Sequence, residues 1–135
     1  MIKVVLDTNV LVSALITTGK SRALLFKIIE GKAQLILSRG ILEELAMVVA
    51  DDKIRLYVKE EEVAEFLRIL NDVAKVVRLR SRFKVVKDDP GDDVILRTAY
   101  DGEADYIVSG DKHLLSLKAF RDIKILTVDE ILSML

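Results

Sequence analysis

Four short runs of apolar, mostly β-branched or leucine residues recur along the chain and predict buried strands. They cover residues 2–6, 34–37, 106–108 and 124–126. Apart from Lys3, every residue of the first run is apolar, so both faces of the strand would be apolar. This is typical of a strand that is buried on both faces in a parallel sheet. It ends abruptly at an acidic residue, Asp7.

Between these runs, apolar residues recur at helical spacing and predict helices. Ser38 is a suitable N-cap for a helix whose apolar stripe holds Ile41, Leu45, Val48 and Val49, and Gly31 is a suitable C-terminal cap for the helix before it. Asp89 and Pro90 have the residue types of an N-cap and a first helical position. The expected helices are 10–16, 21–30, the one after Ser38, 60–74, 90 to about 102, and short ones from Lys112 and Asp129.

Strands that alternate with helices indicate βαβ crossovers, which place a parallel sheet between two layers of helices. We therefore expect an α/β fold: a single three-layer α/β/α domain over residues 1–135, with a central, mostly parallel sheet of four to five strands. Sites in such sheets form beyond the carboxyl ends of the strands. The residues just after each strand are thus the first candidates for function.

Composition narrows the chemistry that this domain can carry out. The 135 residues include 21 Lys and Arg against 22 Asp and Glu, so the net charge of -1 excludes a uniformly basic nucleic-acid binder but not a local basic patch. There is no cysteine and one histidine, His113. A metal site would therefore rest on oxygen ligands, which suit Mg²⁺ or Mn²⁺. Residues 1–7 are too short an apolar run for a signal peptide or membrane span, so we expect a cytoplasmic protein.

Acidic residues occupy positions where ordinary surface acids are not required. Asp7 and Asp111 each follow a predicted strand, while Glu44 and Asp92 lie on the predicted inward lines of their helices. Helix capping is an alternative role for Asp7, Asp92 and Asp111. Glu44 on a core-facing stripe would need a partner, because an unpaired buried carboxylate is costly.

All four positions fall at the same rim of the predicted sheet. Carboxylates that converge in one cleft repel one another, and one or two divalent cations would neutralise them. Two such metals can activate water and stabilise both oxygens in phosphodiester cleavage.

A basic stretch precedes the helix that begins near Pro90. From Lys75 to Lys87 there is no acid, and its middle part alternates charged with uncharged residues, which places the charges on one face of an extended chain. Binding of an RNA backbone is one interpretation, and a solvated edge strand whose charges discourage aggregation is the other. The candidates for RNA binding are Arg78, Arg80, Arg82, Lys84 and Lys87.

Several motifs in order resemble the PIN-domain family over essentially the whole chain. They are Val5-Leu6-Asp7-Thr8-Asn9-Val10, Leu42-Glu43-Glu44-Leu45, Asp89-Pro90-Gly91-Asp92-Asp93 and Ala104-Asp105-Tyr106-Ile107-Val108-Ser109-Gly110-Asp111. The resemblance implies a Mg²⁺- or Mn²⁺-dependent endoribonuclease of VapC-like, toxin–antitoxin type. It also implies a metal-binding and catalytic quartet of Asp7, Glu44, Asp92 and Asp111.

The same resemblance gives supporting roles to neighbouring residues and to other chains. Asn9 and Ser109 match small polar helpers near the metal, and Asp93 is a candidate to support the ligands. Glu43 against Glu44 and Asp92 against Asp93 remain alternatives, with helical position favouring Glu44 and Asp92. Homodimers and an antitoxin protein are the implied partners, and the apolar helices 10–16 and 24–29 are the expected self-association surface.

Other functions account for fewer of these residues. Phosphatases of the aspartyl-phosphate type need a second Asp where Asn9 stands, and a receiver domain has no role for Glu44. A non-catalytic or RNA-processing-associated module that binds nucleic acid or protein on the same fold is the remaining alternative. His113 is interpreted as a surface residue, Asp105 as structural, and Asp88 and Asp89 as turn and cap.

Overall fold

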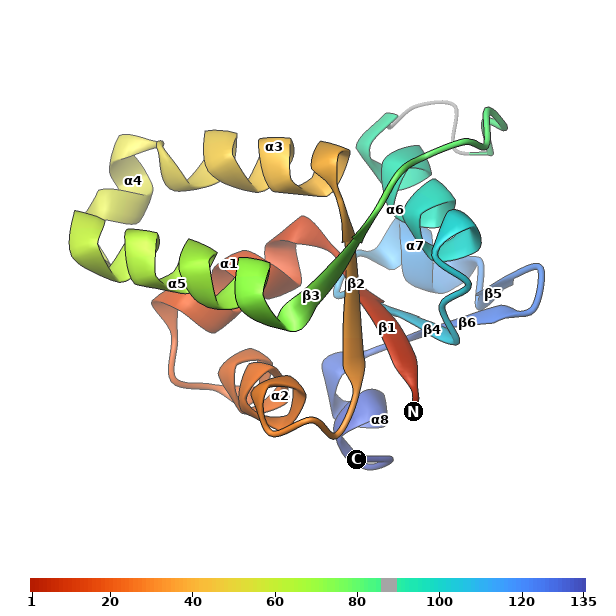
Figure 1. Ribbon diagram of the computed structural model, residues 1–135, viewed down its shortest axis with the longest axis horizontal. Coiled ribbons are helices and arrows are strands. Elements are labelled where there is room, and N and C mark those ends of the chain that lie inside the picture. Colours follow the sequence, from red (N-terminus) through yellow and green to blue (C-terminus); the bar gives the residue numbers. More distant parts are fainter. Residues whose placement is uncertain (86–89) are drawn as a thin grey trace.

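A twisted sheet with helices on both sides forms the framework of the computed structural model, which describes residues 1–85 and 90–135 (Figure 1). Among these residues the sheet has six strands in the order β3-β2-β1-β4-β6-β5. Their bounds are β1 Lys3–Leu6, β2 Gln34–Ser38, β3 Ala74–Val77, β4 Tyr106–Val108, β5 Ala119–Phe120 and β6 Ile123–Leu126.

Neighbouring strands run parallel except for β5, which pairs antiparallel with β6. The predicted α/β class with a mostly parallel sheet is confirmed. Two short edge strands, β3 and β5, raise the strand number above the expected four to five. They escape a pattern search because each is too short or too exposed to show an apolar run.

The described ranges contain eight helices, of which seven lie between strands and α8 follows the last strand. Their bounds are α1 Thr8–Ile16, α2 Lys20–Ile29, α3 Arg39–Val49, α4 Asp52–Arg55, α5 Glu60–Val73, α6 Pro90–Asp101, α7 Lys112–Ser116 and α8 Val128–Leu132. In the view of Figure 1, α1, α2, α3 and α5 lie to the left of β2, and α6 and α7 lie to its right. The expected helices are thus present, and only the short α4 was not predicted.

The core lies around the central strands, as their composition predicts. Val4, Val5 and Leu6 of β1 are fully buried, and so are the three central residues of β2. Helix α6 covers this part of the sheet by packing against β1, β2 and β4. Because β1 is buried on both faces, it holds the residue that follows it, Asp7, at a fixed position at the carboxyl end of the central strands.

Local capping explains where several helices begin. Asp7 accepts a hydrogen bond from the Val10 N–H at the start of α1, and Ser38 accepts one from the Ile41 N–H at the start of α3. Asp111 caps α7. Gly31, with a φ of 84°, follows the C-cap residue Glu30 of α2 in the left-handed conformation that glycine favours.

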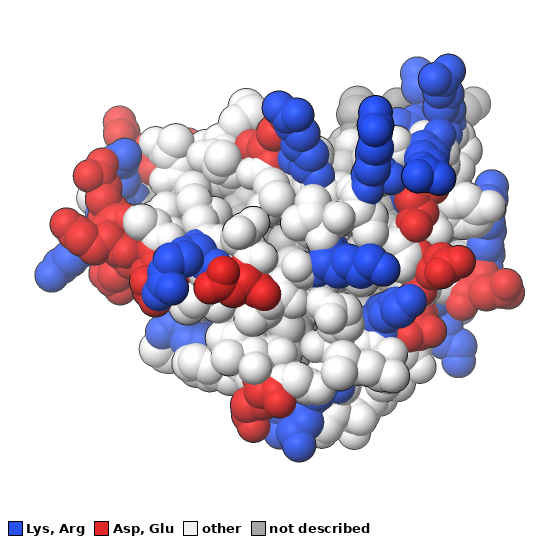
Figure 2. All heavy atoms as spheres, viewed as in Figure 1, with Lys and Arg blue, Asp and Glu red and all other residues white. Residues whose placement is uncertain are grey.

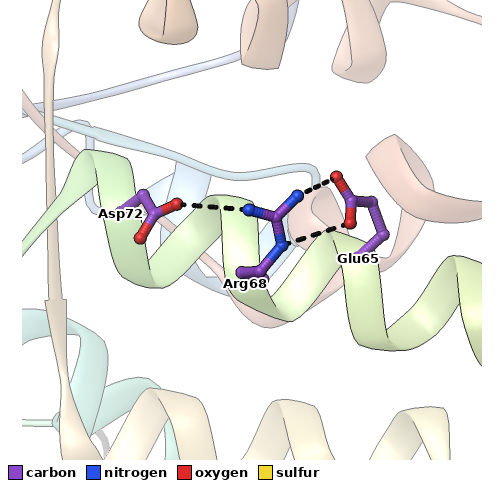
Figure 3. Close-up of polar contacts among 3 residues, drawn as sticks. All are labelled: Glu65, Arg68 and Asp72. Atoms are coloured by element: carbon purple, nitrogen blue, oxygen red, sulfur yellow. Dashed lines mark hydrogen bonds and ion pairs between the residues drawn. The ribbon is translucent and has the colours of Figure 1, made fainter.

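The surface helix α5 shows what an ordinary charged face looks like in this molecule. Arg68 is hydrogen-bonded to Glu65 and lies 3.9 Å from the Asp72 carboxylate (Figure 3). All three side chains are more than half exposed. Exposed pairs of this kind contribute little to stability.

Only one of the two helices expected to form a self-association surface exposes apolar side chains. Helix α1 is almost entirely buried within the chain, whereas Phe26 and Ile29 of α2 are 55% and 41% exposed. The expected surface on residues 10–16 is therefore wrong, since those residues complete the core. Among the described residues, no helix has both the length and the apolar character needed to cross a membrane.

Candidate active site

The four predicted acids come from separate elements and line one pocket. Asp7 directly follows β1, Glu44 lies in α3, Asp92 lies in the first turn of α6, and Asp111 lies beyond the end of β4. The pocket has a volume of about 70 Å³, and its remaining lining residues are Thr8, Asn9, Gly91 and Ile95. The carboxyl ends of two adjacent parallel strands thus meet two helices at this point.

Asp7 is the most constrained acid of the pocket. It is 5% exposed, and its carboxylate accepts hydrogen bonds from the Val10 N–H at 2.9 Å and from the Ser109 hydroxyl. Burial raises the pKa of Asp7, and the negative charges of Asp111 and Glu44 raise it further, against the lowering effect of its two hydrogen bonds. The acids therefore repel one another across the pocket, as the sequence predicts.

Ser109 links two of the acids directly. Its fully buried hydroxyl donates to Asp7 and accepts a hydrogen bond from the Asp111 N–H at 2.9 Å. The Asp111 carboxylate in turn accepts from the His113 N–H at 2.7 Å. Ser109 thus fixes the orientation of Asp7 relative to the turn that carries Asp111, which gives physical content to its predicted helper role.

The prediction that Glu44 lies on a buried stripe is wrong. The buried line of α3 consists of Ile41, Leu45 and Val49, and Glu44 sits beside that line with an exposed side chain. It reaches the pocket from the rim and needs no buried partner. Glu43 turns away, toward Arg39, with which it forms an ion pair at 3.0 Å.

The two adjacent acids of α6 face different surroundings. Asp92 is 7% exposed and lines the pocket, while Asp93 is 5% exposed and accepts a hydrogen bond from the Val85 N–H at 2.8 Å. Asp93 therefore holds the segment before α6. Asn9 is exposed and lines the pocket.

The predicted alternation of the basic stretch is confirmed, but the stretch is not a strand beyond Val77. Arg78, Arg80, Arg82 and Lys84 are exposed, and Leu79, Ser81 and Phe83 between them are partly buried. Lys87 lies outside the described residues, as do Asp88 and the predicted cap Asp89. Figure 2 shows Lys and Arg side chains gathered in the upper right of the view, over the region that follows β3 in Figure 1.

The donor chemistry of the pocket fits a hard divalent cation. All four acids offer oxygen, and the buried hydroxyl of Thr8, which lines the pocket, has no hydrogen-bond partner among the described residues. Sequence reasoning gave Thr8 no role, because a threonine after an acid carries no signal of its own. In the described ranges, no group of three or more His, Cys, Asp or Glu residues converges closely enough to hold an ion.

Two residues set aside from the sequence have ordinary roles. His113 is exposed in α7, outside the pocket lining. Asp105 accepts a hydrogen bond from the Lys3 N–H at 2.8 Å and so ties the start of β4 to β1.

Comparison with known proteins identifies the family. An uncharacterized protein of Methanocaldococcus jannaschii is 34% identical over 119 residues, which span 87% of this chain and 76% of that protein. The crystal structure of VapBC2 from Rickettsia felis bound to a DNA fragment from their promoter shares the fold, with a TM-score of 0.63, 14% identity, and coverage of 93% of this chain and 98% of that one. Residues 3–113, which include all four acids of the pocket, match the PIN domain, and the chain therefore belongs to the PIN domain family.

Proposed function

We propose that this PIN domain is a Mg²⁺- or Mn²⁺-dependent endoribonuclease that hydrolyses RNA phosphodiester bonds. The observation that carries the proposal is that four carboxylates from separate segments line one pocket, where burial and the charges of Asp111 and Glu44 raise the pKa of Asp7. PIN domains are generally nucleases that use divalent metals.

Residues in and beside the pocket have two proposed roles, which are to bind the cation and to orient the residues that bind it. Asp7, Glu44, Asp92 and Asp111 would hold the cation. Divalent cations in such sites activate water for attack on phosphorus and neutralise charge on the phosphate oxygens. Ser109 keeps the Asp7 carboxylate turned toward the Asp111 side of the pocket. Asn9, exposed at the same rim, would donate its amide to a phosphate oxygen.

Membership of the family also leads us to propose partner proteins and a cellular location. The solved neighbour from Rickettsia felis is a VapBC complex bound to DNA, which supports the role of a toxin that pairs with an antitoxin protein. We propose the cytoplasm as the place where this pair acts. A homodimer is also proposed, and the exposed Phe26 and Ile29 on α2 are the apolar residues available to an interface.

Metal titration calorimetry combined with RNA cleavage tests the proposed activity. The wild type should bind Mn²⁺ and cleave RNA, and EDTA should abolish cleavage. Asp7→Asn and Asp92→Asn should each lose most of the metal heat and all detectable cleavage. The control Asp72→Asn removes the same charge from the exposed face of α5 and should behave as the wild type.

Each alternative predicts a different result. Cleavage that survives in both pocket variants or in EDTA would refute the metal-dependent mechanism. Metal binding without cleavage of any RNA would favour the non-catalytic module that binds nucleic acid or protein.

A further inference from the structure

The segment that follows β3 leaves the sheet and runs beside α6 (Figure 1). Asp101, at the C-terminal end of α6, holds the beginning of this segment. One of its carboxylate oxygens accepts hydrogen bonds from the Arg80 N–H at 2.8 Å, the Ser81 N–H at 3.1 Å and the Ser81 hydroxyl at 2.9 Å. Burial raises the pKa of Asp101, but these bonds and the positive charge of Arg80 outweigh it and hold the pKa below its ordinary value.

Two further side chains of α6 hold the rest of the segment. The Arg97 guanidinium donates two hydrogen bonds to the Phe83 carbonyl, at 2.9 and 2.6 Å, and Asp93 accepts from the Val85 N–H at 2.8 Å. Positions 93, 97 and 101 are four apart and so share one helix face. The segment therefore runs antiparallel to α6, and it ends at the helical turn that carries Asp92.

The inward side of the segment is anchored by an aromatic cluster. The Phe83 ring packs edge-on against Tyr100, with the ring centres 5.7 Å apart, and in a tilted arrangement against Phe120, with the centres 5.0 Å apart. The Arg121 guanidinium lies 5.0 Å from the centre of the Phe83 ring. Cation–π and aromatic contacts of this kind favour one fixed arrangement over many loose ones. The exposed side is thus presented on a rigid support.

The outward side carries the basic ridge, which we define as Arg78, Arg80, Arg82 and Lys84. All four side chains are exposed, and within the described part of the chain none of them is in an ion pair with an acid. Alternate residues of an extended chain are roughly 7 Å apart. Phosphates along a single nucleic-acid strand are separated by a comparable distance.

Protection of a sheet edge does not account for this ridge. Such protection is needed where backbone N–H and C=O groups are open to another strand. Here the N–H groups of Arg80, Ser81 and Val85 and the carbonyl of Phe83 are already bound by side chains of α6.

We propose that the basic ridge binds the sugar–phosphate backbone of single-stranded RNA and leads it along α6 to the acidic pocket, with Asp101 and Arg97 as the residues that position the ridge. The inference rests on the proposed ribonuclease function and adds a binding path to it. Asp101 and Asp92 are nine residues apart along α6, so the path is roughly 14 Å long. It ends beside Asp92, because Asp93 holds Val85 at the first turn.

Binding of a labelled oligouridylate, measured by fluorescence anisotropy in EDTA, tests the ridge without cleavage. Each phosphate contact on a single strand contributes about 0.7 to the salt slope, which is about fivefold in affinity at about 0.1 M salt. The triple variant Arg78→Gln, Arg82→Gln, Lys84→Gln should therefore bind on the order of 100-fold more weakly, with a slope smaller by about 2. The control Lys32→Gln, Lys53→Gln, Lys124→Gln changes the net charge equally and should stay within a few-fold of the wild type.

The positioning role of Asp101 is tested by a substitution whose expected effect on RNA affinity is opposite to the effect of its charge change. Asp101→Ala makes the protein more positive, so a purely electrostatic effect would strengthen RNA binding. Loss of the anchor should instead weaken binding severalfold and lower the salt slope. The control Asp72→Ala carries the same charge change on α5 and should bind RNA as tightly as the wild type or slightly more tightly.

The outcomes separate this inference from the function on which it rests. Equal binding by the triple variant and its control, or tighter binding by Asp101→Ala, would refute the ridge while leaving Mn²⁺-dependent cleavage intact. Duplex RNA that competes as well as the single strand would refute the single-strand assignment, and polyglutamate that competes equally would indicate an acidic protein partner instead. If the wild type does not cleave RNA with Mn²⁺, but the triple variant still binds RNA more weakly than its control, the proposed ribonuclease function is refuted and the ridge is not.

Discussion

Ser109→Ala should destabilise the protein by more than its size suggests. The hydroxyl that it removes is fully buried, donates to the Asp7 carboxylate and accepts from the Asp111 N–H. A hydrogen bond to a charged group contributes about 1.5–3 kcal/mol and a neutral one about 0.5–1.5 kcal/mol. We therefore expect the free energy of unfolding in EDTA to fall by about 2–4 kcal/mol.

The loss should depend on pH in a direction that the structure fixes. The pKa of Asp7 is raised by burial and by neighbouring acids, and the Ser109 hydrogen bond opposes that rise, so Ser109→Ala raises it further. Between the unfolded value of 3.8 and the raised folded value, the folded chain binds more protons, and stability falls as the pH increases. The deficit of Ser109→Ala should thus be largest at neutral pH and shrink as the pH falls toward 3.8.

Urea unfolding followed by circular dichroism, repeated across this pH range, measures both effects. Ser116→Ala is the matched control, because its exposed hydroxyl donates only to the His113 carbonyl at 2.7 Å, and we expect it to cost less than about 0.5 kcal/mol. A loss for Ser109→Ala no larger than that of the control, or one that grows in acid, would refute the assignment of Ser109 as the link between the two acids.

Other substitutions test separate features of the structure. Asp7→Asn should flatten the rise in metal-free stability that occurs as the pH is lowered toward 3.8, because the buried charge is absent; an unchanged pH profile would contradict the raised pKa. Gly102→Ala should cost about 1–3 kcal/mol in urea unfolding, because a Cβ there would lie 2.5 Å from Ile36 Cγ2, whereas Gly110→Ala, with open space around it, should cost little. Arg68→Ala should leave the thermal unfolding temperature almost unchanged, and any small loss should shrink in high salt, since its ion pairs are exposed; a clear fall in the unfolding temperature would show that these ion pairs stabilise the fold.

Sequence pattern was sufficient for the elements whose burial is uniform. The run before Asp7 and the stripe on α3 predicted β1 and that helix because apolar spacing reports directly on burial. The two-residue β5 and the exposed β3 depend on pairing with neighbours far along the chain, which spacing does not record.

For the pocket, sequence position identified the acids better than it described their surroundings. Glu44 lies one residue before the buried Leu45, and that small rotation about the helix axis separates a rim position from a core position. The role of Asp93 could not be inferred, because its partner is the Val85 backbone, and any residue except proline supplies an N–H there.

The strand order β3-β2-β1-β4-β6-β5 has a consequence for how this protein can change over time. The chain builds outward from β1 in one direction and then returns through α6 to build outward in the other, so β1 and β4 form a topological switch point. Connections leave these two strands toward opposite faces, and a crevice opens between them whatever side chains occupy it. The four acids of the pocket therefore line a cavity that the topology itself creates. A related protein that lost these acids would keep the fold and the crevice, and the crevice would be available to bind a different ligand.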